Sequence, residues 1–518
     1  MASQSRRVWA VALAVAVSGC AIPVHEPRLH EPTAPPVGGG KKGSPLKVHL
    51  KSGGLLVLDP WTADPGRGRV SGTGQEYTLA RAKDGEPRRH DVALEDVALL
   101  ETSEPQSVSS VGLGFVIFTT AVLGTFTGYC TISPKSCFGS CPTFYVLGPD
   151  GREPERPQAE GFSESIARVL ESRDLDALLV ERPGGANVTV VMRNEALETH
   201  AVRRVRLLAA PRPRGGRVLA GTDDRLHAAR ALLPPAECRA PEGDCRTTLG
   251  ALDGADRASP ADERDLATRE VVELRFPPAR GPAGIAIAAR QTLLSTFLFY
   301  QTMAHVGRGA GEFLAAVERG GPEAGRRALG MARVLGGIDV EVTEGDGPWR
   351  TIGSFDEAGP IAGDLRVLPF EAEGLGPLRV RLRLAKGHWR LDAVALARLG
   401  PAVAPVRLEP IAVERGGQRD DAARKSLVRG EGHLVTQPGD AYRLSFRLPP
   451  GDGPFDLFLE SEGFYYEWMR AEWLAEENPL LAAVAVADPA GALRQMAPAY
   501  KAREATLEQA FWASRFRK

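Results

Sequence analysis

The first twenty residues constrain this chain more than any other feature, because they decide where the rest of it folds. Arg6 and Arg7 precede an unbroken run of ten apolar residues over 8–17, and small residues then lead to Cys20. This order is typical of an export signal, and the run is shorter than the about 20 residues that span a bilayer. The pattern predicts removal of residues 1–19 and folding in an oxidising compartment. An ordinary secretory signal or an N-terminal anchor helix is the alternative.

Residues 17–20 read Val-Ser-Gly-Cys, which resembles the end of a bacterial lipoprotein signal. The resemblance implies that Cys20 carries a fatty acid such as palmitate, becomes the mature N-terminus and attaches the protein to a membrane. Ala21 and Ile22 lack the acidic residue that marks retention in many inner membranes. We therefore expect an outer-membrane lipoprotein of the cell envelope, on its periplasmic or surface face.

Length and composition predict a folded protein of several domains. The 518 residues suffice for about three cores, and 43% apolar with 25% charged residues is ordinary globular composition. The 64 Lys and Arg residues are balanced by 65 Asp and Glu residues. Because binding to nucleic acid depends on clustered positive charge, nucleic acid is not an expected partner.

Five cysteines remain if Cys20 carries lipid. Cys238 and Cys245 flank a loop that contains Pro and Gly, and in an oxidising compartment they predict a local disulfide. Three further thiols without a nearby histidine fall short of the tetrahedral set that zinc takes, so neither a metal nor a cofactor is expected. One disulfide is expected within this group, and its third thiol is free or pairs outside the chain; the group consists of Cys130, Cys137 and Cys141.

The expected fold class is mainly β with helical insertions (α+β), with a small β-barrel-like unit, two β-sandwich-like domains and a helical C-terminal tail. Strict alternation of apolar residues predicts the strands, and apolar residues at helical spacing predict the helices. The expected segments are a signal peptide (1–19), a Pro/Gly-rich tether (20–45), a small β domain (46–104), a charge-free apolar segment (105–134), a β-sandwich-like domain (135–290), a helical insertion (291–337), a jelly-roll-like β domain (338–400), a small β unit (401–463) and an aromatic-rich helical tail (464–518).

The charge-free segment is the least ordinary part of the sequence. Its run over 108–129 is long enough to cross a membrane at about 1.5 Å per helical residue. One crossing would put everything after it on the other side of the membrane from Cys20, and an outer-membrane lipoprotein should not carry a spanning helix. We favour a segment that is buried or covered by an envelope partner, and a spanning helix stays the alternative.

Residues 378–384 alternate strictly between apolar side chains and arginines, which predicts a strand with Arg379, Arg381 and Arg383 on one face. Such a row can meet an anionic ligand. Antiparallel sheets commonly expose one face to water, however, and a solvated outer face is the interpretation that we favour.

Trp349 and the string His388-Trp389-Arg390 are the candidate ligand-binding residues. The stretch over 347–399 resembles galactose-binding-like jelly-roll modules, which also carry a Trp beside a core strand near the end of the domain. The resemblance implies a carbohydrate ligand, because an exposed Trp with Arg or Asp can stack on and hydrogen-bond a sugar. Trp389 is in phase with Leu391, however, and this alternation favours core packing for it.

The sequence carries no local motif of a metalloprotease, an α/β-hydrolase, a β-lactamase or a P-loop enzyme. His200 lies near Glu198, and His227 lies near two aspartates. No nucleophile in a recognisable turn accompanies either histidine, so we interpret both as surface pairs. No catalytic residue is assigned.

Residues 139–145 read Gly-Ser-Cys-Pro-Thr-Phe-Tyr and follow the charge-free segment directly. With the preceding β unit and the downstream Arg193-Asn194-Glu195 strand, they resemble a family of large bacterial envelope lipoproteins. Members have a charge-free run, then Ser-Cys-Pro-Thr, an aromatic residue and Tyr, and β-rich domains. The likeness spans most of residues 46–460 and implies an envelope location without a particular activity. The chain departs from the family after Tyr145, where its loop is rich in Pro and Arg.

Aromatic residues crowd the predicted C-terminal tail. Tyr500, Leu507 and Phe511 fall on one helical stripe, so that face must be buried. Packing on the chain's own β domains is expected, because a terminal amphipathic helix usually closes its own core. Docking on a partner is the alternative, since aromatic residues are favoured at binding hot spots, and its candidates are Trp468, Trp473, Phe511 and Trp512.

These features predict a lipid-anchored cell-envelope protein of structural or interaction type, which acts as a scaffold or binds a partner. Besides the membrane, the expected partners are envelope proteins that contact residues 108–129 or the C-terminal helices. A carbohydrate-binding lipoprotein is the second hypothesis. A hydrolase with a site assembled from distant residues is the third.

Overall fold

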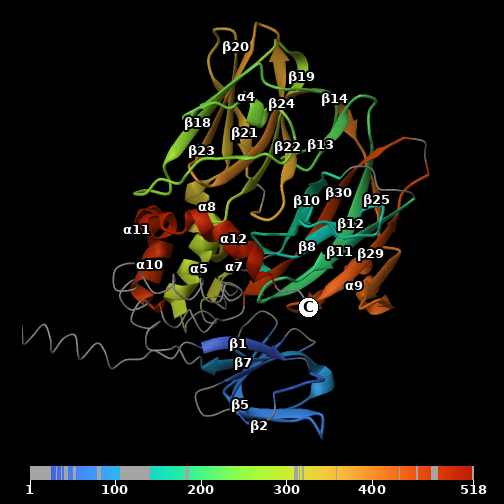
Figure 1. Ribbon diagram of the computed structural model, residues 1–518, viewed down its shortest axis with the longest axis vertical. Coiled ribbons are helices and arrows are strands. Elements are labelled where there is room, and N and C mark those ends of the chain that lie inside the picture. The colour runs from blue at the N-terminus through green and yellow to red at the C-terminus, as the bar shows by residue number, and fades with distance from the viewer. Residues whose placement is uncertain are drawn as a thin grey trace, which may run out of the picture.

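The computed structural model shows three β units and a layer of helices (Figure 1). It describes residues 25–30, 32–36, 38–39, 45–50, 54–78, 83–105, 141–180, 186–307, 313, 316–317, 320–356, 359–430, 432–450, 453–467 and 476–515. The predictions for the 108–129 run and for five single residues lie outside this range, namely those for Cys20, Cys130, Cys137, Trp468 and Trp473.

The N-terminal module, at the bottom of Figure 1, is one sheet in the order β1-β7-β3-β4-β5-β6, with β2 beside β4. Val48, Leu56 and Val97 point into its single core, and polar side chains alternate with them along the strands. Its elements are β1 (His25–His30), β2 (Gly38–Gly39), β3 (Leu46–Leu50), β4 (Leu55–Asp64), β5 (Arg69–Tyr77), β6 (Arg88–Ala93), the 3-10 helix η1 (Leu94–Asp96) and β7 (Val97–Pro105).

The first strand of this module comes from the predicted tether. β1 pairs antiparallel with β7, from His25 opposite Pro105 to His30 opposite Leu100, and β2 pairs with β4. The many prolines of residues 20–45 had predicted an extended tether. An edge strand tolerates Pro, however, and its ladder is made by backbone groups rather than by apolar side chains. The tether prediction is therefore wrong for β1 and β2.

The proximal sandwich is the unit next to the module, and its two sheets come from both ends of the remaining chain. The first sheet has the order β10-β30-β12-β25, with β28 also on β12, and consists of β10 (Ser172–Leu178), β12 (Glu198–Pro211), β25 (Val406–Leu408), β28 (Leu434–Thr436) and β30 (Phe455–Glu467). The second has the order β27-β26-β29-β11-β8-β9 and consists of β8 (Thr143–Val146), β9 (Ala159–Glu160), β11 (Asn187–Arg193), β26 (Ala412–Arg415), β27 (Gln418–Arg419) and β29 (Ala441–Arg447).

One core fills the space between these two sheets. Val205 and Leu207 of β12 and Leu459 of β30 are buried there with Val190 and Leu444 of the facing sheet. Along β12, apolar residues alternate with arginines. Because successive side chains of a strand point to opposite faces, the apolar side chains point inward and the arginines point outward.

The distal sandwich lies at the top of Figure 1 and is inserted between β12 and β25. Its inner sheet has the order β14-β13-β22-β19-β24-β17, β14 also pairs with β24, and the strands are β13 (Arg217–Gly221), β14 (Leu226–Leu233), β17 (Arg257–Ala258), β19 (Arg280–Gln291), β22 (Asp364–Glu373) and β24 (Trp389–Val403). Its outer sheet has the order β16-β15-β18-β23-β20-β21, with β15 (Glu237–Ala240), β16 (Gly243–Asp244), β18 (Arg269–Phe276), β20 (Ile338–Glu344), β21 (Arg350–Phe355) and β23 (Leu378–Ala385).

The two sandwiches share a third core, because the sheets that meet there are apolar on both faces. Ile285 and Ile287 of β19 point into the distal sandwich, whereas Ala286 and Ala288 pack with residues of the proximal sandwich that include Phe458. The side chains at this contact are mostly small, which lets the two inner sheets approach closely.

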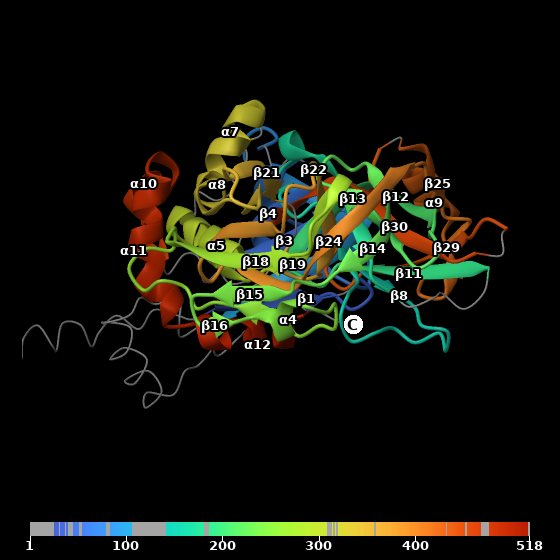
Figure 2. The same ribbon diagram turned by 90° about the horizontal axis from the view of Figure 1, so that it is seen from above.

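The helices gather on one side of the sheets, as Figure 2 shows from above. Phe297, Leu335, Leu493 and Tyr500 form part of the core between them. The layer consists of α5 (Leu294–Val306), α7 (Gly321–Ala328), α8 (Gly330–Leu335), α10 (Pro479–Ala487), α11 (Pro489–Lys501) and α12 (Glu504–Ser514), and the sandwiches carry the 3-10 helix η3 (Arg168–Leu170), α4 (Arg246–Leu249) and α9 (Asp421–Arg429). Among the described residues, no helix combines the length and the apolar composition needed to cross a membrane.

The mainly β fold class with two sandwiches and added helices is confirmed. The predicted segments, however, are not separate domains, because strands of one segment pair with strands of another. β12, expected within 135–290, pairs with β30, whose first nine residues were expected in 401–463. β22 and β24 likewise pair with β19. An alternating pattern shows which face of a strand is buried but not which strand lies beside it.

The start of the predicted helical tail is also a strand. Phe464, Tyr465 and Tyr466 belong to β30 and pair with residues 199–201 of β12. Aromatic residues favour strands, and the two-sided pairing of β30 outweighs the helical pattern that was expected to begin at this point.

A core substitution tests this discontinuous sandwich. Leu459→Ala should lower the free energy of unfolding of the sandwich by about 2–5 kcal/mol, because a fully buried leucine leaves a cavity. Leu375→Ala is the control, since Leu375 is 69% exposed, and it should change this value by less than about 0.5 kcal/mol. Denaturant titrations measure both changes, and equal effects of the two substitutions would contradict the packing described.

Candidate functional site

The predicted ligand-binding tryptophans do not form an open cleft. Trp389 is 1% exposed and lies in the distal core, where its ring meets the edge of Phe355 at 5.5 Å between centroids. Trp349 is partly covered by Arg381, whose guanidinium carbon lies 4.0 Å from the ring centroid. The prediction that Trp389 stacks on a sugar is therefore wrong, because its ring is buried in the distal core. The alternation with Leu391 had favoured this core position.

The neighbours of Trp389 are engaged as well. His388 is 2% exposed, and burial together with the charge of Arg269 lowers the pKa of His388 to about 3, so its imidazole is neutral at physiological pH. Arg390 donates to Asp256 at 2.8 Å and also pairs with Glu508 of α12. His388 is therefore buried in the core, and Arg390 joins the distal sandwich to α12.

The predicted arginine row is flanked by carboxylates. Arg381 donates to Glu273 of β18 at 2.8 Å, and Arg383 lies opposite Asp339 of β20. The outer face of this sheet therefore carries charges of both signs, which fits a solvated face.

The predicted histidine pairs have other surroundings than expected. His200 and Glu198 are fully buried, with 3.3 Å between Nε2 and Oε1, so the interpretation as a surface pair is wrong for them. Near His227, Asp224 accepts hydrogen bonds from Arg173 at 2.6 Å and Arg366 at 2.9 Å. The carboxylate of Asp224 is therefore bound by the two arginines.

The disulfide between Cys238 and Cys245 is confirmed, with an S–S distance of 2.01 Å. Cys141 is a free and buried thiol. Burial, followed by the charges of Glu160 and Glu198, raises the pKa of Cys141 well above its usual value. A thiol in this state is a poor nucleophile, because the thiolate is the reactive form.

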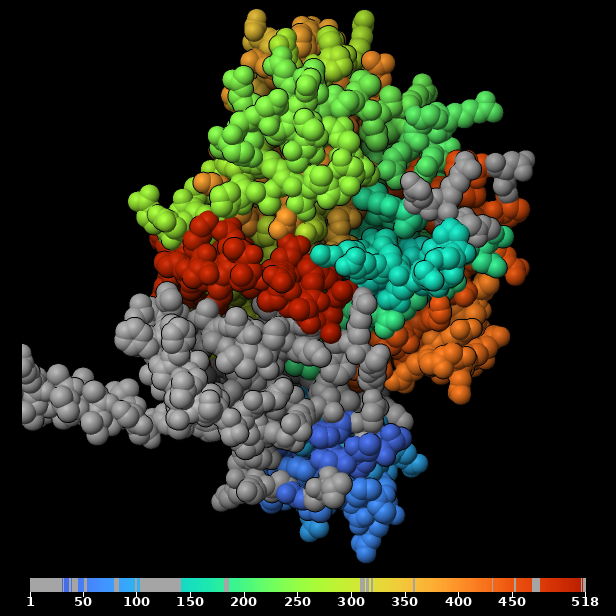
Figure 3. All heavy atoms as spheres, viewed as in Figure 1, coloured from blue at the N-terminus to red at the C-terminus, as the bar shows by residue number. Residues whose placement is uncertain are grey.

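The C-terminal helices pack on the chain's own domains and bridge both sandwiches. Phe511 is 2% exposed in the helical core, so it is unavailable to a partner. Glu508 pairs with Arg290 of the distal sandwich, whereas Arg156 of the proximal unit stacks on Trp512 at 3.7 Å. Figure 3 shows these helices in red, below the green surface of the distal sandwich and beside the cyan surface of the proximal one. Packing on the chain's own domains is thus confirmed for Phe511 and Trp512, and Phe511 is wrong as a partner-docking residue because it is buried.

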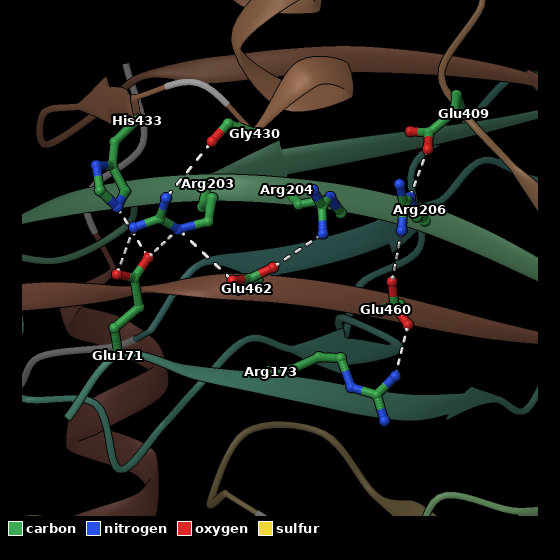
Figure 4. A network of polar contacts seen from close by, with 10 residues as sticks. All are labelled: Glu171, Arg173, Arg203, Arg204, Arg206, Glu409, Gly430, His433, Glu460 and Glu462. Atoms are coloured by element: carbon green, nitrogen blue, oxygen red, sulfur yellow. Dashed lines mark hydrogen bonds and ion pairs between the residues drawn. The ribbon is translucent and has the colours of Figure 1, made fainter.

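A ladder of charges covers the polar part of the first proximal sheet (Figure 4). Arg203 makes two hydrogen bonds of 2.7 Å with Glu171, which also contacts His433 at 2.8 Å. Burial opposes ionisation of Glu171, but the hydrogen bonds from Arg203 and His433 outweigh it and lower its pKa. Arg204 contacts Glu462 at 3.3 Å. The pairs join neighbouring strands and balance one another's charge.

The ladder continues into the contact between the sandwiches. Arg173 bridges Glu460 at 3.0 Å and Asp224 at 2.6 Å, and Asp224 in turn accepts from Arg366. Arg366 is 2% exposed and also pairs with Asp364. A buried charge of this kind is stable only while its partners stay in place, so the network fixes how the two sandwiches meet.

A cavity of about 130 Å³ lies where the proximal sandwich meets α5 and α8. Its wall includes Cys141, Glu160, Glu198, Tyr465 and Glu467, which come from separate segments of the chain. Glu160 is 2% exposed, and its Oε1 accepts from the backbone N–H of Ile361 at 2.8 Å. Burial raises the pKa of Glu160 to about 7. The described residues contain no group of three or more metal-ligating side chains placed to hold a metal ion.

Sequence reasoning missed this cavity because its residues have no common spacing. Glu160 ends a strand of two residues, and Glu467 is the last residue of β30. The only signal was indirect, namely acidic residues at the ends of strands, and it identifies no partner among distant segments.

Comparisons with known proteins add no identification. No protein-family model and no curated protein match the chain. The secreted serine protease VesC from Vibrio cholerae matches with 8% identity over 71% of this chain and 98% of that chain, at a TM-score of 0.15. A mutant VP2 protein of infectious bursal disease virus matches with 10% identity over 95% and 91%, at 0.14, and the GH31 alpha-xylosidase from Xanthomonas citri with 10% over 82% and 38%, at 0.14. Scores this low carry no argument about fold or function.

The thiols make a direct prediction. Mass spectrometry without reduction should find Cys238 linked to Cys245 and Cys141 free, which leaves Cys130 with Cys137 as the expected second link. Iodoacetamide should label Cys141 only after unfolding, because the thiol is buried and protonated in the native protein. Rapid labelling of native Cys141, or its recovery in a disulfide, would contradict the site described.

Proposed function

We propose that this protein is a lipid-anchored cell-envelope protein of interaction type, whose N-terminal module rests on the membrane and carries the two sandwiches away from it. The observation that carries the proposal is the register of β1 and β7, which puts His25 opposite Pro105. This pair is the point at which the chain enters and leaves the module sheet.

Two apolar attachments therefore start from one end of the module. Cys20 lies five residues before His25, and the apolar run begins at Val108, three residues after Pro105. Extended chain spans at most about 3.6 Å per residue, so these attachments start within roughly 18 Å and 11 Å of the same strand pair. A lipid on Cys20 and the run over 108–129 can thus reach the same membrane surface.

The pairing of the two attachments has an energetic reason. Membrane affinity rises with the apolar area that enters the interface, so an apolar run next to the lipid adds to the affinity of the acyl chains on Cys20. It does so without crossing the bilayer, which fits the topological argument from Cys20. The module then acts as a spacer that sits directly on the surface.

A cleft of about 710 Å³ between the module and the proximal sandwich supports the interaction type. Glu95 lines it from the module, and Arg415, Asp420 and Asp440 line it from the sandwich. Clefts between units are preferred sites for ligands, and the charged lining suits a polar segment of an envelope partner. The carbohydrate alternative has lost the exposed Trp389 on which it depended.

Fractionation of the wild-type protein and three variants tests the proposal. Cys20→Ser should abolish fatty-acid labelling and lower the membrane-bound fraction. Replacing residues 108–129 by a Gly/Ser linker of equal length in that background should release the remainder. The linker in the wild-type background is the control for folding, and it should keep the labelling. A labelled Cys20→Ser protein, or a doubly changed protein that stays bound, would rule out the proposed attachment.

A further inference from the structure

Among the described residues, the charged side chains that line the cavity beneath α5 are all acidic. Of the described residues that line it, four are glutamates and none is Lys or Arg. Glu164 is exposed and marks the mouth, whereas Glu160, Glu198 and Glu467 are buried in the interior. A cleft lined by one charge concentrates ions of the opposite sign, so this cavity favours a cation.

Glu160 supplies an acceptor that the fold leaves unused. Its Oε1 takes the backbone N–H groups of Ile361 at 2.8 Å and Ala362 at 3.2 Å. Its Oε2 is buried and has no hydrogen-bond partner among the described residues. The nearest compensating charge, Arg290, is directed elsewhere and donates to Pro360 and Glu508. An unsatisfied carboxylate oxygen in a cavity wall costs stability unless a ligand donates to it.

The remaining wall is apolar and aromatic. Leu298, Phe299 and Met303 of α5 and Met331 of α8 line it, and Tyr465 adds an aromatic ring from β30. Metal ions need several oxygen, nitrogen or sulfur ligands at once, and no such group occurs among the described residues. An organic cation, by contrast, needs few acceptors, an apolar wall and aromatic faces.

We propose that this cavity binds a small organic cation, an alkylammonium with a short apolar chain, whose ammonium group donates to Oε2 of Glu160. The volume of about 130 Å³ is close to the roughly 150 Å³ that accommodates a benzene-sized molecule, so the ligand has on the order of six to eight heavy atoms. The inference is independent of how the protein is anchored.

Titration calorimetry with n-pentylammonium and its neutral counterpart n-pentanol tests the site. Wild-type protein should bind the ammonium at least tenfold more tightly than the alcohol, because only the ammonium meets the carboxylate. Glu160→Gln should remove this preference. Glu371→Gln is the matched control, since Glu371 is exposed on β22 and lines no part of the cavity. Equal binding by the wild-type and Glu160→Gln proteins would overturn the proposal.

A second variant covers the case in which Glu160→Gln does not fold. Ala332→Leu adds bulk from α8 to the cavity wall and keeps a good helix former, so it should weaken pentylammonium binding at least tenfold. Unchanged binding in a folded Ala332→Leu protein would place the ligand elsewhere and overturn the site.

The pH dependence gives an independent readout. Glu160 must be ionised to bind, and with a pKa of about 7 its ionised fraction rises about tenfold between pH 6 and pH 8, so binding should tighten by that factor. The other titratable groups on the described wall are Cys141 and Tyr465, whose pKa values are raised by burial so that both stay neutral, together with Tyr300, Glu164, Glu198 and Glu467. Affinity that is constant over this range, or falls, would contradict the role of Glu160.

Discussion

The structure depends on the pairing of β30 with β10 and β12. This strand lies near the C-terminus, yet it is hydrogen-bonded on both sides by strands from the first half of the chain. Its two faces enter different cores, with Leu459 in the proximal sandwich and Phe458 at the contact between the sandwiches. The proximal sandwich is therefore incomplete until residues 455–467 have been added, and the distal sandwich folds as an insertion within it.

Many of the charged side chains described above form ion pairs with one another instead of an unpaired charged surface. The arginines of β12 face carboxylates of β30 and its neighbours, and buried Arg366 is held by Asp364 and Asp224. The C-terminal helix extends the same principle, since Glu508 bridges two arginines of the distal sandwich. The nearly equal numbers of basic and acidic residues, 64 and 65, allow such pairing. Glu160 departs from this rule, because its buried Oε2 has no hydrogen-bond partner among the described residues. This unused acceptor is the reason why we propose a ligand there.

Local sequence patterns predicted the elements better than their neighbours. Alternation over 338–342 and 378–384 identified real strands, and the phase of Trp389 with Leu391 correctly favoured the core. Pairing between β12 and β30 joins residues more than two hundred positions apart, and no local period records it. The candidate site was out of reach for the same reason, because Glu160 and Glu467 become neighbours of one cavity only after these long-range pairings form.

Amide hydrogen exchange followed by mass spectrometry tests the central role of β30 most directly. If β30 closes the proximal sandwich, its amides and those of β12 open only together, in the global unfolding of that sandwich, and both exchange at the same slow rate. Peptides from 455–467 and 198–211 should then respond identically to added denaturant. Fast exchange of β30 beside a protected β12 would contradict the account, since it would show that the sandwich stands without its C-terminal strand.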